Sequence, residues 1–279
     1  MVYNVAVKLL ITGEPKSGKS TLLKFLLETL PEKKRGFITL EVIVNEERSG
    51  FDVVASNGEK VKLARTNMPN EFSVGKYFVE PNNLDRLIDN LKPPKNNELL
   101  YIDEIGQMQF LSTKFNALVT KYLESKNDLV ATISQVYQND TIEKIQSSAN
   151  TILINLTLKN RTQMKNIALI MLGNRSAFNA LPNQAQKETI VLAKQYLQQE
   201  QYICLQKLFK KAIYYYSNSV EYSSSEKFIV HGKHADHIVS YIDHKSWTCD
   251  CPLSNRKQTN ETTLDCSHYM AVRLYKLKQ

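Results

Sequence analysis

An eight-residue segment near the N-terminus has the spacing of a loop that binds polyphosphate. It reads Gly13-Glu14-Pro15-Lys16-Ser17-Gly18-Lys19-Ser20 and matches G-x-x-x-x-G-K-[ST] at every position. In such a loop, backbone N–H groups surround the phosphates at the positive end of a helix. We expect Lys19 to reach the β- and γ-phosphates and Ser20 to offer its hydroxyl to Mg²⁺. Thr21 follows, where it can meet the α-phosphate or cap the first helical turn.

Two acidic residues end a later apolar run and complete this chemistry. Asp103 and Glu104 follow Leu99-Leu100-Tyr101-Ile102, as expected of a central strand that leads into a site. Asp103 is predicted to hold Mg²⁺ through water. Glu104 is the candidate general base, because a carboxylate beside the γ-phosphate can orient and deprotonate the attacking water.

Three of the four cysteines lie near the C-terminus in a pattern typical of a metal site. Cys249 and Cys251 are followed after 14 residues by Cys266 and His268, which gives C-x-C and C-x-H. Three thiolates and one imidazole can enclose one tetrahedral Zn²⁺, closed to solvent and therefore structural. The alternative is a set of reduced core cysteines with an incidental histidine. Cys204 stands alone in a helical pattern and is expected to be a small buried side chain.

The apolar pattern predicts the elements that position these residues in the first half of the chain. The predicted strands are residues 5–12, 37–44, 99–103, 129–134 and 151–155. The predicted helices are residues 19–29, 84–91, 113–124 and 140–147. A hairpin is predicted between 51–55 and 60–64, where Asn57-Gly58 favours a tight turn. Such alternation indicates an α/β fold, with a mainly parallel sheet covered by helices.

The second half of the chain has a different pattern. Residues 183–218 contain no Gly or Pro and show helical spacing, which fits one long helix or two packed helices. Two strands, 228–230 and 238–242, precede the cysteines, and a helix is predicted over 269–274. We therefore predict three parts: a phosphate-binding domain over 1–165, a helical connector over 166–225 and a small ββα zinc module over 226–279.

Composition restricts the class of protein. The chain has 279 residues, 42% hydrophobic and 23% charged, with a net charge of +8, which is ordinary for a globular protein. No apolar run approaches the ~18 residues of a membrane-spanning helix, so we expect a cytosolic protein with no membrane partner. The basic excess is larger after residue 165, with 14 basic and 9 acidic side chains against 22 and 19 before it.

Residues from about 5 to 165 resemble a known family in several further motifs. In chain order these are Gly36-Phe37-Ile38-Thr39-Leu40-Glu41-Val42, Arg48-Ser49-Gly50-Phe51-Asp52, Val74-Gly75-Lys76-Tyr77, Asp103-Glu104-Ile105-Gly106-Gln107-Met108, Ala131-Thr132-Ile133 and Asn160-Arg161. They are similar to the small P-loop nucleoside triphosphatases of thermophiles, called cancer-related nucleoside triphosphatases in animals. The resemblance implies Mg²⁺-dependent hydrolysis of ATP, GTP and other nucleoside triphosphates, on a sheet related to RecA-like or kinase-like folds. By matching position, Lys19, Ser20, Asp103 and Glu104 have the roles given above.

Two arginines are weaker candidates, and the chain departs from the family at several positions. Arg161 and Arg48 are candidates to neutralise γ-phosphate charge in the transition state, although Arg161 could equally clamp a carboxylate. The family usually has glycine at the position of Lys16 and often threonine at that of Ser20. It usually reads Lys-Met-Glu where this chain has Gln107-Met108-Gln109, so the roles of that lysine and glutamate are in doubt here.

The cysteine pattern resembles the SWIM-type zinc finger, which implies binding to DNA or to a protein. After Cys251, residues 252–279 carry five basic side chains against two acidic ones: Arg256, Lys257, Arg273, Lys276 and Lys278 against Glu261 and Asp265. This balance allows a contact with DNA or RNA phosphates, and a solvated basic face would look the same.

Three functions remain in competition. The first is a Mg²⁺-dependent nucleoside triphosphatase with a structural zinc module that binds nucleic acid or a protein partner. The second is a nucleotide or nucleoside kinase. The third is a nucleic-acid-binding protein in which a bound nucleotide acts as a switch.

Overall fold

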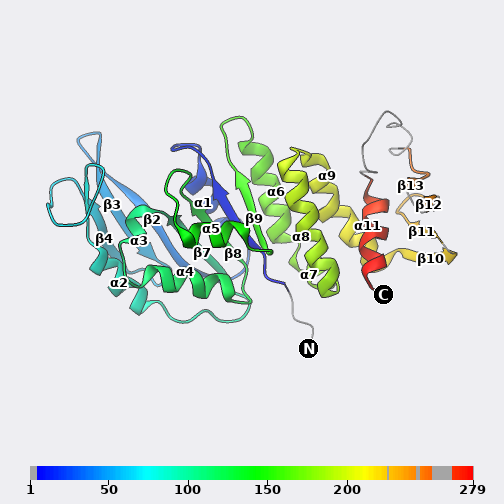
Figure 1. Cartoon of the computed structure of the whole chain (residues 1–279), viewed down its shortest axis with the longest axis horizontal. Helices are drawn as coiled ribbons and strands as arrows, with labels where there is room; N and C mark the ends of the chain where they lie inside the picture. The colour runs from blue at the N-terminus through cyan, green and yellow to red at the C-terminus, as the bar shows by residue number, and fades with distance from the viewer. Residues whose placement is uncertain (1–4, 225, 243–245, 253–265, 279) are drawn as a thin grey trace. The chain divides into compact units, whose positions relative to one another are not determined.

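The computed structural model describes residues 5–224, 226–242, 246–252 and 266–278. The chain divides into two compact units. One comprises Ala6–Met164, and the other combines Met1–Val5 with Lys165–Gln279. Figure 1 shows the first unit in blue to green and the second mainly in yellow to red.

The first unit is built on a mixed sheet whose parallel half carries the predicted site. Within the described residues this sheet has nine strands, in the order β5-β6-β4-β3-β2-β7-β8-β1-β9. The parallel strands are β2 (Lys34–Val44), β7 (Leu99–Ile105), β8 (Leu129–Ile133), β1 (Lys8–Thr12) and β9 (Thr151–Asn155). Every residue of β1 and β8 is buried, as expected of central strands covered on both faces. The predicted α/β fold with helices on a largely parallel sheet is confirmed in this part.

The other half of this sheet is antiparallel. It consists of β3 (Glu47–Ala55), β4 (Lys60–Arg65), β5 (Ser73–Val74) and β6 (Tyr77–Val79). The β3–β4 hairpin turns at Asn57-Gly58, as the sequence predicts, and Gly58 has a φ of +85°. No sequence pattern predicts β5 and β6, because strands of two and three residues are too short to show alternation.

Helices connect the parallel strands. They are α1 (Lys19–Thr29), α2 (Pro81–Asn90), α3 (Gln107–Phe110), α4 (Phe115–Glu124) and α5 (Asp140–Ser147). The helix α6 (Arg161–Gly173) follows the last strand, β9, and continues into the second unit. The connection from β1 to β2 through α1 runs in one direction along the sheet, and the connections from β7 to β8 through α4 and from β8 to β9 through α5 run in the other. Because such crossovers are right-handed, α1 lies on one face of the sheet and α4 and α5 lie on the other. The core between the sheet and α4 is apolar and includes Phe37, Phe115 and Ile142.

The second unit contains helices followed by a small sheet. The helices are α7 (Arg175–Asn179), α8 (Asn183–Gln198), α9 (Tyr202–Lys207), a π-helical turn η1 (Leu208–Ala212) and α10 (Ile213–Asn218). The helical conformation is interrupted after α8, where Glu200 has a φ of +54°, so the two-helix alternative holds for residues 183–218. No helix in the described ranges is long and apolar enough to cross a membrane.

The sheet of the second unit is larger than the sequence predicted. Its described strands are antiparallel in the order β10 (Val220–Ser224), β11 (Lys227–His231), β12 (Asp236–Ile242) and β13 (Ser246–Cys249). The sequence predicted only the inner two. Four of the five β10 residues are exposed, which removes the alternating pattern, and β10 lies within the stretch assigned to a helical connector. The helix α11 (Ser267–Tyr275) and a 3₁₀ turn η2 (Lys276–Lys278) follow.

Candidate active site and metal centre

The loop Gly13–Gly18 connects β1 to α1 and is shaped by its glycines. Gly13 has a φ of +145°, and a Cβ there would lie 2.2 Å from the backbone oxygen of Leu156. Gly18 has a φ of +99° and begins α1 with no side-chain cap, so the first N–H groups of the helix face outward from its end. Lys16 also has a positive φ, of +66°. The local structure is the strand, loop and helix that a polyphosphate cradle needs.

The side chains of this segment differ in their surroundings. Lys19 donates from Nζ to the backbone oxygens of Gly13, at 2.9 Å, and Glu14, at 3.2 Å. Ser17 is buried, and its Oγ has no hydrogen-bond partner among the described residues. Ser20 and Thr21 lie exposed on the first turn of α1, and Pro15 is exposed in the loop. The structure therefore brings the predicted residues 13–21 together around one loop.

Asp103 reaches this loop across an intervening strand. It lies on β7, which is separated from β1 by β8. Ser20 donates to Asp103 Oδ1 at 3.1 Å, and Thr132 on β8 donates to the same oxygen at 2.5 Å. Burial raises the pKa of the Asp103 carboxyl, while the hydrogen bonds from Thr132 and Ser20 and the charges of Lys24 and Lys19 oppose that rise.

The second oxygen of Asp103 is suited to a cation. Asp103 is 2% exposed, and its Oδ2 has no hydrogen-bond partner in the described part of the chain. A buried carboxylate oxygen without a donor is costly unless a cation or water completes it. The hydroxyl of Ser20 contacts the other oxygen, Oδ1, of the same carboxylate, so the site offers oxygen donors, which fit Mg²⁺.

Glu104 follows Asp103 in the chain, and the backbone oxygen of Asp103 between them is held by Thr39, which Gln109 contacts in turn; the sequence assigned neither residue a role in the site. Burial raises the pKa of the Glu104 carboxyl, Lys19 lowers it and Asp103 raises it again. Thr39 on β2 donates to the backbone oxygen of Asp103, and Gln109 on α3 donates to Thr39 Oγ1 at 3.4 Å. The sequence also assigned no role to Thr132, which donates to Asp103. Its position as a polar residue within the otherwise apolar strand β8 is the signal that could have identified it as a site residue.

The two candidate arginines have different surroundings. Arg161, at the start of α6, donates from Nε to the backbone oxygen of Ser17 at 2.6 Å and from Nη2 to that of Lys16 at 2.8 Å. It therefore braces the phosphate loop from its carbonyl side. Arg48 instead pairs with Glu41 at 2.8 Å and donates to the Tyr77 hydroxyl at 2.9 Å.

A family model described as NTPase matches residues 8–169. The chain belongs to the NTPase family. The nucleoside-triphosphatase THEP1 of Thermotoga maritima is 37% identical over 168 residues, which cover 60% of this chain and 95% of that protein. The protein of the same name from Methanocaldococcus jannaschii is 31% identical over 163 residues, covering 57% of this chain and 92% of that protein.

Two solved structures share the fold of the family region. The crystal structure of THEP1 from the hyperthermophile Aquifex aeolicus is 29% identical with a TM-score of 0.52, and the match covers 60% of this chain and 99% of that one. The solution structure of a human cancer-related nucleoside triphosphatase is 25% identical with a TM-score of 0.50, covering 60% of this chain and 97% of that one.

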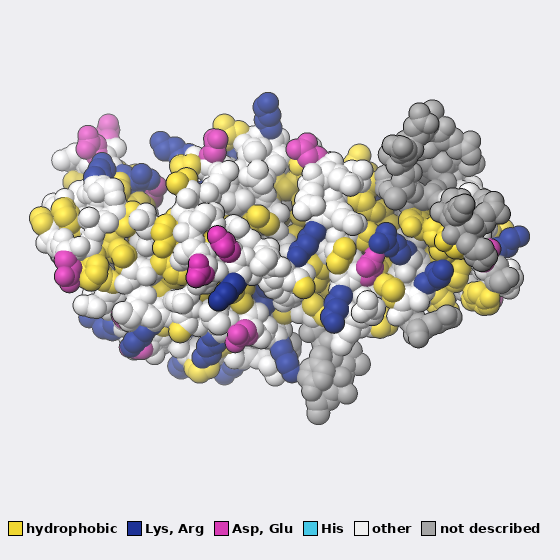
Figure 2. All heavy atoms as spheres, viewed as in Figure 1, with side chains coloured by type: hydrophobic (Ala, Val, Ile, Leu, Met, Phe, Trp, Pro, Cys, Tyr) yellow, Lys and Arg dark blue, Asp and Glu magenta, His cyan; other side chains and the backbone are white. Residues whose placement is uncertain are grey.

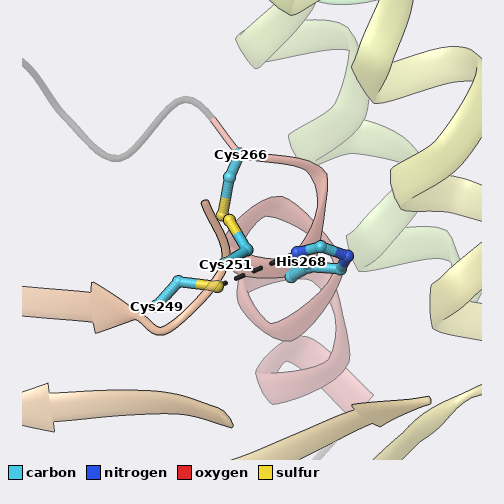
Figure 3. Close-up of side chains that lie close together, drawn as sticks. All are labelled: Cys249, Cys251, Cys266 and His268. Atoms are coloured by element: carbon cyan, nitrogen blue, oxygen red, sulfur yellow. Dashed lines mark hydrogen bonds between the residues drawn. The ribbon is translucent and has the colours of Figure 1, made fainter. Parts of the chain in front are cut away.

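The cysteine and histidine cluster lies beyond the part of the chain that matches the NTPase family. Figure 3 shows Cys249, Cys251, Cys266 and His268 converging from the end of β13 and the start of α11. All four are buried, and their ligand atoms lie within 4.8 Å of one another. Such a set of three sulfurs and one nitrogen fits a closed tetrahedral Zn²⁺ site.

Hydrogen bonds within the cluster link two of its sulfurs. The contact between Cys249 and Cys266 lowers the pKa of the Cys266 thiol and, together with burial, raises that of Cys249, so the two sulfurs share one proton. His268 and the backbone N–H of Tyr269 lower the pKa of Cys266 further, which favours its thiolate, the form that binds zinc. The ring of His237 stacks on His268 with centroids 4.2 Å apart, which helps to fix the ligand ring.

Proposed function

We propose that the unit Ala6–Met164 hydrolyses nucleoside triphosphates to diphosphate and phosphate with Mg²⁺. Membership of the NTPase family and relatives named nucleoside-triphosphatase support this enzyme class. The observation that carries the proposal is the Asp103 carboxylate, which accepts from Ser20 and Thr132 and keeps one buried oxygen to which no described residue donates. The same carboxylate contacts Ser20, on the first turn of α1 directly after the phosphate loop, and Glu104 is the next residue in the chain.

Each step of the hydrolysis has a residue to perform it. The backbone of Gly13–Ser20 binds the phosphates, Lys19 contacts the β- and γ-phosphates, and Ser20 and Asp103 hold the cation. Mg²⁺ supplies positive charge that offsets the charge on the phosphates. Glu104 takes a proton from water as the water oxygen bonds to the γ-phosphorus, and the electron pair of the breaking bond leaves with the diphosphate. The raised pKa of Glu104 makes it a stronger base than an exposed glutamate.

Product analysis tests this reaction against a kinase. Full-length protein with Mg²⁺ and ATP or GTP should release phosphate and diphosphate nucleotide in equal amounts, and EDTA should stop the release. Adding a nucleoside or nucleoside monophosphate should change neither rate nor products. A phosphorylated acceptor, formed at the expense of free phosphate, would replace the hydrolase with a nucleotide or nucleoside kinase.

We further propose that Cys249, Cys251, Cys266 and His268 hold one structural Zn²⁺, as in the SWIM-type pattern. Their burial and mutual distances support a closed site, which takes no part in hydrolysis. Metal analysis of the purified chain should give one zinc per molecule. Strong chelation should remove it and lower the melting temperature, whereas a metal-free protein with unchanged stability would contradict the proposal.

A nucleic-acid strand is the partner that we propose for this module. Lys and Arg side chains are scattered among Asp and Glu on the face in Figure 2, so the support comes from one specific cluster rather than a broad patch. The ammonium of Lys276 lies 4.9 Å from the centroid of Trp247 and 5.2 Å from that of Tyr241. An aromatic ring beside an exposed cation can stack on a base while the cation meets a phosphate.

The single tryptophan of the chain makes this partner easy to test. Titration with single-stranded DNA or RNA should quench Trp247 fluorescence, and the affinity should fall steeply with salt. Nucleotide added beforehand should alter that affinity if the nucleotide acts as a switch. Unchanged fluorescence at low salt would exclude a nucleic-acid strand here and favour a protein partner.

A further inference from the structure

The order of the strands fixes the direction in which a bound nucleotide extends. The phosphate loop follows β1, and Asp103 and Glu104 end β7 on one side of it. The phosphate that reacts must lie toward these carboxylates, because Glu104 activates the water that attacks it. The rest of the nucleotide therefore extends toward the opposite side of β1, where β9 is the neighbouring strand. Figure 1 shows β9 in green beside the blue β1.

The loop after β9 is bound directly to the phosphate loop. Leu156 donates its backbone N–H to the oxygen of Thr12 at 2.8 Å, and its own oxygen lies against Gly13. At the other end of the loop, Arg161 donates to the oxygens of Ser17 and Lys16. Both ends of this five-residue connection are therefore held to the two ends of the phosphate cradle.

The same loop is also held from within. Asn160 accepts from the backbone N–H of Thr157 at 2.8 Å and donates from Nδ2 to the oxygen of Asn155 at 2.9 Å. These bonds close the turn around Leu158 and fix the direction of its backbone. A fixed loop loses little conformational freedom when a ligand binds to it.

Leu158 is a large apolar side chain that this fixed loop leaves in solvent. It is 71% exposed, although a leucine gains stability by burial. We infer that Leu158 is the nucleobase subsite: it packs against the face of the base of a nucleotide held in the phosphate loop. This inference rests on the proposed function, which assigns residues to the phosphates and to Mg²⁺ but none to the base. Every base has an apolar face, so such a contact carries no hydrogen-bond code and accepts purines and pyrimidines alike.

The subsite is tested by comparing ligands with and without a base. Full-length Leu158→Ala and Leu158→Asp are titrated calorimetrically with the Mg²⁺ complexes of ADP, GDP, CDP and UDP, and with inorganic tripolyphosphate. We expect each nucleotide to bind about five- to tenfold more weakly, by a similar factor, as when one apolar contact is lost. Tripolyphosphate, which has no base, should bind as it does to the wild type.

The control and the contrary outcomes are equally specific. Ile203→Ala removes an apolar side chain of matched exposure, 70%, from the second unit and should leave every affinity unchanged. Unchanged nucleotide affinity in both Leu158 variants, a loss confined to one base, or an equal loss for tripolyphosphate would each overturn the inference. A wild-type chain that binds neither tripolyphosphate nor nucleotide would instead refute the phosphate site, and the base subsite with it.

Discussion

Thr132→Val tests how the structure tunes Asp103, the carboxylate that we propose to bind Mg²⁺. Thr132 is fully buried, and its hydroxyl donates to Asp103 Oδ1, so valine keeps the shape of the side chain and removes one donor. A hydrogen bond to a charged group contributes about 1.5–3 kcal/mol. Because no solvent reaches this position, water cannot replace the lost donor. We therefore expect kcat/KM for Mg²⁺-ATP to fall about ten- to a hundredfold at neutral pH.

The pH dependence gives the direction of the effect. Burial raises the pKa of Asp103 and the Thr132 hydrogen bond opposes this, so its removal raises that pKa further. The acidic limb of the activity profile should move to higher pH, measured as phosphate release in buffers from acidic to alkaline. Thr151→Val is the matched control, since Thr151 is 1% exposed and its hydroxyl has no partner among the described residues. A wild-type acidic limb in Thr132→Val, or an equal loss in Thr151→Val, would refute this reasoning.

Three further predictions concern the metal, the loop and acid stability. Cys266→Ser should reduce bound zinc below one per chain by metal analysis, while Cys204→Ala should leave zinc content unchanged. Gly13→Ala should abolish nucleotide binding and lower the melting temperature, because its Cβ would lie 2.2 Å from a backbone oxygen. As its control, Gly58→Ala places a Cβ with nothing within 4 Å. It should lower the free energy of unfolding only by the ~1–2 kcal/mol of a left-handed residue. Glu98→Gln removes a 7%-exposed carboxylate whose pKa an arginine hydrogen bond lowers from 4.5 to about 2. Its contribution of about 3 kcal/mol is present above the unfolded pKa and lost as the pH falls toward 2, so in denaturant titrations the difference from wild type should disappear in acid.

Local patterns predicted the parts of the site that are contiguous in sequence. The phosphate loop needs glycines and a lysine at fixed spacing, and the run that ends at Asp103 is apolar for as long as a strand requires. Both signals can be detected in a single sequence, because residues that are neighbours in the chain produce them. The same is true of the hairpin at Asn57-Gly58, where the backbone conformation itself selects the residues.

Contacts between distant strands were beyond local patterns. Thr132 meets Asp103 only because β8 lies between β7 and β1, and no spacing in the chain encodes that order. Lys8 is similar: it interrupts an apolar strand, yet its ammonium is buried and donates to the backbone oxygens of Tyr122 at 2.8 Å and Asn127 at 2.6 Å. Polar residues of this kind interrupt an apolar strand pattern, and only their hydrogen-bond partners in the folded structure explain why they are there.

Missing or weak periodicity accounts for the remaining differences. The strand β10 is exposed along most of its length, so its residues carry no two-residue alternation. The break between α8 and α9 falls in a polar stretch without glycine or proline, and its only mark is the positive φ of Glu200. Neither feature has a side-chain signal that a sequence pattern can detect.

Glu104→Gln tests the central claim most directly, because it removes the base and keeps the size of the side chain. Phosphate release from Mg²⁺-ATP and Mg²⁺-GTP is measured beside nucleotide binding, with Glu47→Gln, an exposed glutamate on β3, as control. We expect Glu104→Gln to bind both nucleotides with wild-type affinity and to release phosphate at least about a hundredfold more slowly, on the order expected for loss of a general base. Turnover at the wild-type rate would contradict it, and Glu104 would not be the base.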